Sequence, residues 1–585
     1  MLHKFLYPLF AICLLSAAVQ AQQTGKKLSS TAKAGSISPL TRQYVSPVKI
    51  LWKEGQTSNL EQLLKPGISQ ADLANRNMAI LKNDGSGKKA SILLDFGKEL
   101  QGGLEIVTGM WGPKNLPLKI RVRYGESASE AMSDVGGPKG ATNDHAIRDF
   151  TAMAPWLGRI QLAESGFRFV RIDLEEENAE LQLKEVRAIF TYRDIPYIGS
   201  FKSSDERLNK IWETGAYTVH LNMQEYLWDG IKRDRLVWVG DLHPEISTVN
   251  SVFGYNEVVP KSLDLSRETT PLPGWMNGIS TYSMWWIILH YDWYMQNGDL
   301  NYLKQQKPYL SGLVKQIVAK IGDDNKEKLD GTRFLDWPSS ENPKGIHAGL
   351  QAMTVWSLSA ASKISVLVGD KETADLCNKT VARMRKYVPD PNGSKQAAAL
   401  LTLTGLIPAE KANKEVLSVG GAANFSTFYG YYMLEAKAKA GDHQGAIDVI
   451  REYWGAMLDL GATTFWEDFN MDWIPNASRI DELVPEGKKD VHGDYGAYCY
   501  IGFRHSLCHG WASGPTAWLT EHVLGIKVVE AGCKAIKIEP HLGDLKFVEG
   551  TYPTPYGVLK VKHTKLANGK IKTDVNAPKG VRIIQ

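Results

Sequence analysis

The sequence has few cysteines and no large excess of either charge. Five cysteines occur in 585 residues, which is too few for a disulfide scaffold at this length. One bond would still be possible, and Cys499 and Cys508 are the closest pair in sequence. The 68 Lys and Arg residues nearly balance the 64 Asp and Glu residues, leaving a formal net charge of +4. This balance excludes a strongly basic nucleic-acid groove and a polybasic membrane binder.

Long apolar runs are absent beyond the first residues. Residues 1–21 combine Lys4, the apolar stretch Leu6–Val19 and small residues up to Ala21, the pattern of a cleaved secretory signal peptide. The stretch is too short for a span of about 20 residues, and no stop-transfer charges follow it. The richest later run, Trp285–Leu289, is soon broken by polar residues. We therefore expect a soluble chain without a membrane span, exported to the periplasm or outside the cell.

Several catalytic motifs are also missing. The sequence has no G-x-S-x-G motif, no Walker loop and no dinucleotide fingerprint. His505, Cys508 and His509 could be read as metal ligands, but their spacing has no second matching pair. We expect neither a metal nor an organic cofactor. The sequence leaves the oligomeric state open.

The hydrophobic period divides the chain into regions. Residues 22–46 are rich in Ser, Thr, Gly and Lys, which predicts a flexible lead-in. Residues 47–200 alternate apolar with polar side chains between Gly and Pro turns, which predicts an antiparallel β-sandwich. Alternation returns in residues 528–585, where we expect a small C-terminal β-sandwich packed on the middle of the chain.

The middle region, residues 201–527, has helical periodicity. Ser203 and Glu206 have the spacing of a capping box at its start. Ten or more helices with short turns predict a helical barrel or a superhelical array. We favour the barrel because no repeat of fixed length is visible. Clear examples are the segments His347–Val368, Glu372–Tyr387, Ser426–Ala440 and Gln444–Leu460.

Aromatic and acidic residues gather at a few points of this region. The chain has 17 Trp, whose flat faces fill a core or stack on an apolar ligand face such as that of a sugar. The densest polar cluster, Trp228–Asp241, mixes three carboxylates with cations and indoles, which can hold carboxylates at different pKa values. A structural ion-pair cluster is the alternative, and composition alone favours it. Glu467 beside Trp466, where a helical pattern ends, and Asp336 beside Trp337 form further pairs.

Taken together, these clusters resemble the α-L-rhamnosidases of glycoside hydrolase family 78. That family has a motif of the form D-x-x-x-R-(D)-E-R-x-G-W-x-G-D, followed by G-D-W, G-A-T-T-x-W-E and N-H. The matching residues here are Asp229, Arg233, Trp238, Gly240 and Asp241, then Leu335–Trp337, Gly461–Glu467 and Cys508–His509. The resemblance covers roughly residues 90–560. It implies an (α/α)6 barrel between an N-terminal and a C-terminal β-sandwich.

The resemblance also implies an inverting hydrolysis of terminal α-L-rhamnose from an oligo- or polysaccharide. In such a reaction one carboxylic acid protonates the leaving oxygen, while a carboxylate roughly 6.5–9.5 Å away activates water. Asp234 would be the acid and Glu467 the base. Asp234 must then hold a proton, so we expect Arg233 to engage Asp229 or sugar hydroxyls rather than Asp234.

The remaining site residues are implied to bind the sugar. Asp229, Asp241 and His509 would bond its hydroxyls. The indoles Trp238, Trp337 and Trp466 would form apolar walls.

The sequence departs from the family pattern at three points. Asp234 stands where the family has Glu and is one methylene shorter. Val237 stands where the family usually has Gly, and Glu245 could be a substitute acid. About forty residues separate Glu467 from His509, and we expect this insert to form a loop over the site.

These departures keep other functions open. The chain could be a glycosidase of the same barrel fold that acts on a different terminal sugar. It could also be a non-catalytic glycan-binding relative that kept the aromatic pocket. A purely structural scaffold would leave the clustered indoles and carboxylates unexplained.

Overall fold

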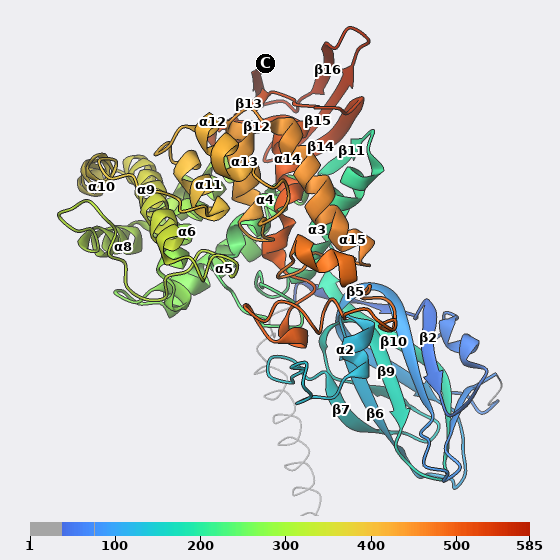
Figure 1. Cartoon of the computed structure of the whole chain (residues 1–585). Helices are drawn as coiled ribbons and strands as arrows, with labels where there is room; N and C mark the ends of the chain where they lie inside the picture. Colours follow the sequence, from blue (N-terminus) through green and yellow to red (C-terminus); the bar gives the residue numbers. More distant parts are fainter. Residues whose placement is uncertain (1–37, 75–76, 585) are drawn as a thin grey trace, which may run out of the picture. The chain divides into compact units, whose positions relative to one another are not determined.

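The fold is described from a computed structural model, which covers residues 38–74 and 77–584. The predicted signal peptide and most of the predicted lead-in lie outside the described residues. The chain divides into a short unit, Met1–Pro39, and one compact unit, Leu40–Gln585. All elements below belong to the second unit (Figure 1).

The N-terminal region is a ten-stranded antiparallel sheet that folds around one apolar core. Its strand order is β3-β4-β10-β5-β9-β6-β7, while β1 pairs with β10, and β2 and β8 pair with β5. Alternate residues of the long strand β5 enter the core, as the period-two pattern predicts. The strands are β1 (Leu40–Val45), β2 (Lys49–Glu54), β3 (Gln56–Ser58), β4 (Ala79–Lys82), β5 (Ser91–Thr108), β6 (Leu118–Gly125), β7 (Asp149–Ala154), β8 (Arg159–Gln161), β9 (Ser165–Leu174) and β10 (Glu180–Arg193).

The first strand corrects one prediction. The lead-in was expected to be flexible up to residue 46, but Leu40–Val45 pairs with Val45 opposite Ala188 in β10. Tyr44 lies 4.2 Å below the Arg187 guanidinium. Ladder hydrogen bonds and this contact stabilise a segment whose composition resembles a linker.

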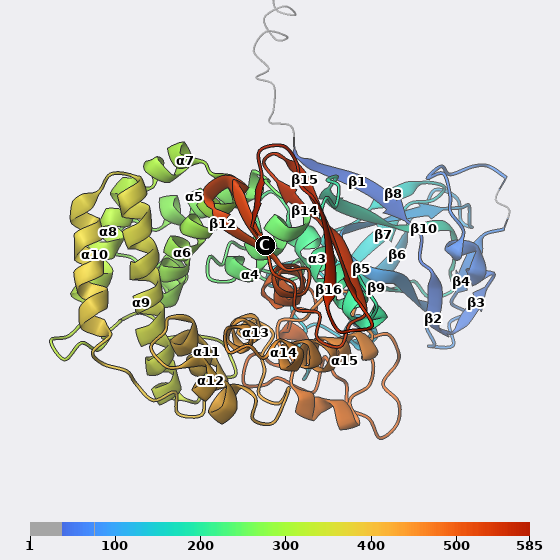
Figure 2. The same ribbon diagram turned by 90° about the horizontal axis from the view of Figure 1, so that it is seen from above.

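The middle of the chain is the expected helical region, and Figure 2 shows its paired helices from above. The four segments predicted above as helices lie in α9, in α10, around α13, and from α14 to α15. The helices are α3 (Glu206–Asn222), α4 (Leu242–Val252), α5 (Val258–Thr269), α6 (Ser280–Asn297), α7 (Leu300–Gln305), α8 (Lys307–Ala319), α9 (Pro343–Leu367), α10 (Lys371–Met384), α11 (Lys395–Leu403), α12 (Ala409–Ala412), α13 (Gly430–Lys439), α14 (His443–Val449), α15 (Gly455–Asp459) and α16 (Gly514–Trp518).

The start of α3 differs from the predicted capping box. Asp205 is the N-cap, and its side chain accepts from the backbone N–H groups of Arg207 and Leu208. Ser203 instead ends strand β11 (Ser200–Ser203). Strand pairing holds Ser203 extended, so the cap falls two residues later.

Helix α6 contains the apolar run Trp285–Leu289. These five residues span more than one turn and are all buried, so this part of the helix is surrounded by the barrel core. No helix in the described residues is long and apolar enough to cross a membrane.

The C-terminal residues form two small sheets against the barrel. One has the order β11-β14-β15-β16 and the other β12-β13-β17. The strand that precedes the barrel, β11, thus pairs with β14 near the chain end (Figure 1). The remaining strands are β12 (Ile526–Glu530), β13 (Ala535–Ile538), β14 (Phe547–Thr554), β15 (Gly557–Lys565), β16 (Ile571–Asn576) and β17 (Arg582–Ile584).

Candidate active site

A cavity of about 150 Å³ lies where several helix connections of the barrel meet. The connection before α4 brings Asp229, Asp234 and Trp238, and Asp241 lies at the N-terminal end of α4. Other segments complete the lining. Its residues are Asp229, Asp234, Trp238, Asp241, Ile279, Tyr282, Thr332, Phe334, Trp337, Glu467, Tyr500, His509 and Trp511.

Arg233 connects the two carboxylates predicted to be acid and base. Its Nη1 donates to Oδ1 of Asp234 at 2.8 Å, and its Nη2 lies 3.1 and 3.0 Å from the two oxygens of Glu467. Its Nε donates to the Arg504 carbonyl at 2.6 Å. The expectation that Arg233 would avoid Asp234 is therefore wrong. The two residues are neighbours in sequence, and the guanidinium has enough donors to bind both carboxylates at once.

Two side-chain nitrogen donors bind Asp234, one on each carboxylate oxygen. Besides Arg233, the indole Nε1 of Trp238 donates to Oδ2 at 3.1 Å. Nε2 of His145 lies 3.3 Å from Oδ1. The side chain is 13% exposed and reaches the cavity. The structure therefore brings the predicted acid to the site, but within an ion-pair network.

Glu467 is buried and fully bonded. Burial alone would raise the pKa of Glu467, but the charges of Arg233, His509 and His505, with the N–H of Ser506, lower it to about 2. That N–H donates to Oε2 at 3.0 Å. Glu467 is thus an ionised carboxylate at neutral pH, as a general base requires.

Asp229 shapes the loop that carries Arg233 and Asp234. Its two oxygens accept from the backbone N–H groups of Asp234 at 2.8 Å and Leu236 at 2.9 Å. Burial and the carboxylates of Asp234 and Asp241 raise the pKa of Asp229 to about 7, against the opposing charge of His509. Asp229 lines the cavity, but its oxygens already hold the loop closed.

Asp241 and His509 form a second pair in the cavity wall. Nε2 of His509 lies 3.2 Å from Oδ2 of Asp241, and the Tyr282 hydroxyl donates to Oδ1 at 2.7 Å. Burial would lower the pKa of His509, but Asp241 and Glu467 raise it overall. Nδ1 of His509 is buried and has no hydrogen-bond partner. A Cβ on Gly240 would lie 2.3 Å from the Tyr282 ring, so only glycine permits this approach.

Two of the three predicted indole walls line the cavity. Trp238 and Trp337 do, but Trp466 does not. Trp466 is buried against Phe469 at 5.8 Å, so its position as a wall residue is corrected. Trp511 takes that place, with its Nε1 donating to the Glu467 carbonyl at 2.9 Å.

Glu245 lies in α4 but does not line the cavity. Both its carboxylate oxygens are buried without a hydrogen-bond partner. Burial and the charges of Asp241 and Asp229 raise its pKa well above the usual range. As a substitute acid, Glu245 would need a path into the cavity that the lining residues do not provide.

The insert after Glu467 contributes directly to the site. Tyr500 lines the cavity, lies 3.9 Å from the Arg233 guanidinium and contacts Trp337 edge-on at 5.2 Å. A loop of the N-terminal sandwich meets the insert, because the N–H of Phe503 donates to the Lys139 carbonyl at 2.8 Å. The expected loop over the site is thus confirmed in position, and the sandwich helps to hold it.

The three possible metal ligands His505, Cys508 and His509 have separate partners. Nδ1 of His505 contacts the Gly502 carbonyl at 2.9 Å, the Cys508 thiol faces the Thr218 carbonyl at 3.9 Å, and His509 pairs with Asp241. Cys499 and Cys508 are not bonded to each other.

Buried carboxylates beside the site are neutralised by a lysine. Nζ of Lys232 lies 3.0 Å from Glu126 and 3.2 Å from Glu130. The same ammonium donates to the carbonyls of Phe503 at 2.9 Å and His505 at 2.6 Å. This network connects the sandwich to the segment that bonds Glu467.

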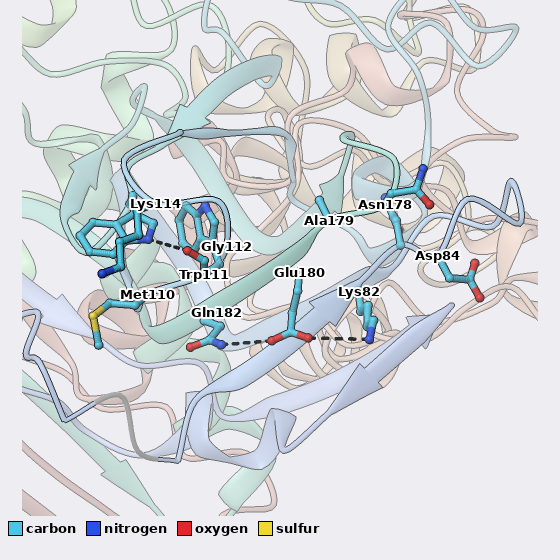
Figure 3. A pocket seen from close by; sticks show the side chains of 12 residues that line it. Lys82, Asp84, Met110, Trp111, Gly112, Lys114, Asn178, Ala179, Glu180 and Gln182 are labelled. Carbon is cyan, nitrogen blue, oxygen red and sulfur yellow. Dashed lines mark hydrogen bonds and ion pairs between the residues drawn. The ribbon is translucent and has the colours of Figure 1, made fainter.

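A larger groove of about 650 Å³ lies on the N-terminal sandwich (Figure 3). Its polar side chains bond one another: Gln182 donates to Glu180 at 3.1 Å, and Lys82 lies 4.0 Å from Glu180. The Trp156 indole donates to the Trp111 carbonyl at 2.8 Å. The groove lacks a buried acid–base pair, so the smaller barrel cavity is the candidate active site.

Comparisons with known proteins identify the family of the chain. A family model described as the bacterial alpha-L-rhamnosidase six-hairpin glycosidase domain matches residues 196–523. A bacterial alpha-L-rhamnosidase C-terminal domain matches residues 525–584. The chain thus has the architecture of the six-hairpin glycosidases. Within that class, it belongs to the bacterial α-L-rhamnosidase family, which confirms the resemblance seen in the sequence.

Individual relatives are distant and mostly longer. The chain is 24% identical over 531 residues to an alpha-L-rhamnosidase of Alteromonas sp. strain LOR, covering 82% of this chain and 54% of the relative. An alpha-L-rhamnosidase of Formosa agariphila is 23% identical over 505 residues, covering 75% and 50%. The chain spans about half the length of these curated relatives.

Solved structures share the fold. The family 78 rhamnosidase of Bacillus sp. GL1 has a TM-score of 0.73 at 22% identity, covering 90% of this chain and 55% of that chain. A rhamnosidase from Klebsiella oxytoca with rhamnose bound has a TM-score of 0.66 at 20% identity, covering 82% of this chain and 96% of that one.

Proposed function

We propose that this protein is an exported glycoside hydrolase that releases terminal α-L-rhamnose, or a closely related sugar, from glycans with inversion. Its family membership and the names of its curated relatives support this function. The observation that carries the proposal is Glu467, an ionised carboxylate in a small aromatic cavity of the barrel.

The size of the cavity favours a single terminal sugar. About 150 Å³ is smaller than the ~300–1,000 Å³ of typical small-molecule pockets. Trp238, Trp337 and Trp511 offer flat apolar faces to one ring, and His509 lines the cavity as the partner of Asp241. An exo-acting enzyme needs such a closed site, because it removes one residue at a chain end.

In the proposed reaction, Glu467 takes a proton from water as the water attacks the anomeric carbon. Asp234 passes a proton to the leaving oxygen as the glycosidic bond breaks. The transition state has oxocarbenium character, so the base mainly orients the water and accepts its proton late. A strongly ionised carboxylate such as Glu467 suits that task.

One observation favours a second candidate, a non-catalytic glycan-binding protein. The two side-chain hydrogen-bond donors to Asp234 are Arg233 and Trp238, one on each carboxylate oxygen. Neither donor has a proton to pass on to a leaving group. A glycosidase of the same fold acting on another terminal sugar also fits the cavity.

The test is sugar release by the chain from residue 22 onward. Purified protein is incubated with α-L-rhamnosides and a rhamnose-containing pectic polysaccharide, and products are separated by chromatography. We expect free rhamnose from the wild type and from Glu410→Gln, an exposed control. We expect none from Glu467→Gln. Another released monosaccharide would favour a different terminal sugar, and saturable binding without any product would favour the non-catalytic candidate.

Export rests on residues 1–21, which lie outside the described residues. The whole chain is expressed, and cell fractions are probed for the protein. We expect a processed form beginning near Gln22 in the periplasm or the medium. A full-length cytoplasmic product would contradict export.

A further inference from the structure

The N-terminal sandwich supplies a histidine to the candidate active site. His145 lies in the loop between the short helix α2 (Ala128–Met132) and β7. Its Nε2 is 3.3 Å from Oδ1 of Asp234. The pair therefore joins two regions of the chain at the residue expected to protonate the leaving group.

The position of His145 is fixed by its surroundings. The neighbouring Asp144 forms an ion pair with Arg504 of the insert. Lys139, in the same loop, lies 3.2 Å from Asp490 and 2.8 Å from Asp494 of the insert. Several contacts between loop and insert thus hold the imidazole against Asp234.

The other side chains around Asp234 do not supply the proton that an acid must pass on. Arg233 binds Asp234 and Glu467 together, so the predicted acid and base share one cation. Arg233 has no proton to transfer in the physiological range, and neither has the indole of Trp238. Among the side chains that contact Asp234, only His145 carries an imidazole, the group that enzymes use most often for general acid–base catalysis.

We propose that His145 is the proton-transfer partner of Asp234 in glycoside cleavage, a role that rests on the proposed function. The imidazolium passes its Nε2 proton to the Asp234 carboxylate. Asp234 passes that proton to the glycosidic oxygen as the bond between the anomeric carbon and this oxygen breaks. Glu467 takes one proton from the attacking water and later loses it to solvent, while His145 regains one from solvent. The net reaction consumes one glycoside and one water and gives the free sugar and the free alcohol.

The exposure of His145 fits this cycle. Its side chain is 29% exposed, against 13% for Asp234 and 4% for Glu467. His145 can therefore exchange protons with solvent while Asp234 lies under the sugar. The charged groups that face the imidazole are Asp144 at 3.7 Å on its own loop and Asp234 from the barrel. Arg504 and Arg233 lie behind these two carboxylates.

The kinetic test compares His145→Gln with His145→Ala. Glutamine keeps an N–H that can donate to Asp234 but cannot carry a transferable proton. We expect both variants to lose about 100-fold or more in kcat/KM on alkyl rhamnosides, within the 10²–10⁴ range of general acid catalysis. On 4-nitrophenyl rhamnoside, whose leaving group needs little protonation, we expect a loss of less than about 10-fold. The alkaline limb of the wild-type pH profile should disappear in both variants.

A structural role predicts a different pattern. If His145 only positions Asp234, His145→Gln restores activity on both substrates and keeps the alkaline limb, which overturns the proposal. Equal losses on alkyl and nitrophenyl substrates overturn it as well. His541→Gln, in the C-terminal region where His541 stacks on His443 at 3.5 Å, is the matched control and should behave as wild type.

A measurement independent of turnover tests the pairing. The imidazole NMR signal missing from His145→Gln identifies His145, and its chemical shift is compared in wild type and Asp234→Asn at one pH. We expect the signal to move in Asp234→Asn, because the carboxylate 3.3 Å from Nε2 is replaced by an amide. An unmoved signal contradicts the pair. If the wild type hydrolyses no glycoside, both the proposed function and the proton-transfer role of His145 are contradicted. If the wild type is active and His145→Gln hydrolyses alkyl rhamnosides equally well, only the proton-transfer role is contradicted.

Discussion

Arg233 binds Glu467 through both carboxylate oxygens, at 3.1 and 3.0 Å from Nη2. This contact is the main attraction that offsets the burial of Glu467 and lowers its pKa to about 2. The same guanidinium binds Asp234 through Nη1. The electrostatics of the site therefore depend on one residue that the sequence pattern placed among the sugar ligands.

Replacing Arg233 should shift the pH dependence of the reaction. In Arg233→Gln the opposing cation is lost, so burial raises the pKa of Glu467 from about 2. The acid limb of kcat/KM should move to higher pH, and the rate at neutral pH should fall by about 100-fold. Arg233→Lys keeps the charge and should move the limb less. A limb that stays in place in both variants would show that Arg233 does not control Glu467. The profile is measured with an aryl rhamnoside.

The ionisation of Asp229, whose side chain holds the loop that carries Arg233 and Asp234, should make the stability of the fold depend on pH. The pKa of Asp229 is raised to about 7 by burial in the folded state, above its ordinary value of 3.8. A raised carboxyl pKa stabilises the fold at low pH, and that contribution is lost as pH rises from about 4 through about 7. The stability of the wild type, measured by urea unfolding, should therefore fall across this window relative to Asp229→Asn, whose amide does not titrate, so the two curves diverge most at the neutral end. Parallel stability curves would contradict the raised pKa.

The lysine between the sandwich and the site should be important for stability. Lys232→Met leaves Glu126 and Glu130 buried without their ammonium partner. Breaking a buried ion pair in this way costs about 3–5 kcal/mol in unfolding free energy. Denaturant unfolding followed by fluorescence measures the loss. Lys304→Met, at an exposed position, is the control and should change little.

The insert should contribute to binding through Tyr500. Its ring faces Arg233 at 3.9 Å and Trp337 at 5.2 Å. A partly buried cation–π contact is worth about 0.5–2 kcal/mol, so Tyr500→Ala should lower kcat/KM by roughly 3- to 30-fold. Tyr500→Phe keeps the ring and should stay close to wild type. Equal kinetics for wild type and the alanine variant would contradict a role for the insert.

Two tryptophans separate the structure from the sequence-based prediction. Trp511 lines the cavity, whereas Trp466 is buried in the core. Trp511→Phe should raise KM several-fold. Trp466→Phe should instead lower the unfolding free energy by about 1–3 kcal/mol with KM nearly unchanged. Steady-state kinetics and thermal unfolding of both variants show which indole forms the cavity wall. A raised KM in Trp466→Phe would support the sequence-based prediction that Trp466 is a wall residue.

Much of the fold could be predicted because hydrophobic periodicity reports burial directly. The change from period two to helical period located the helical region, and the apolar run Trp285–Leu289 forms a fully buried part of α6. Periodicity was less reliable at the ends of elements, where pairing with residues distant in sequence determines whether a segment forms a strand. Leu40–Val45 became a strand by pairing with β10, and Ser203 was held extended by β14.

The candidate site was predicted only in part. Motif residues such as Asp234, Glu467 and His509 meet in one cavity because they lie in helix connections at one end of the barrel. The carboxylates bound by Arg233 could not be predicted, since a guanidinium in a charged cluster has several carboxylates within reach. His145 gave no signal, because it belongs to a loop of another region whose docking is visible only in three dimensions.

The most direct test of the proposed mechanism is to determine which anomer of the sugar is released first. Hydrolysis of an α-L-rhamnoside is followed by ¹H NMR before mutarotation, with wild type and Glu467→Gln compared. Inversion with Glu467 as the base predicts β-L-rhamnose as the first product of the wild type, with no turnover by Glu467→Gln. The α-anomer as first product, or undiminished turnover by Glu467→Gln, would contradict the role of Glu467 as the base that activates water.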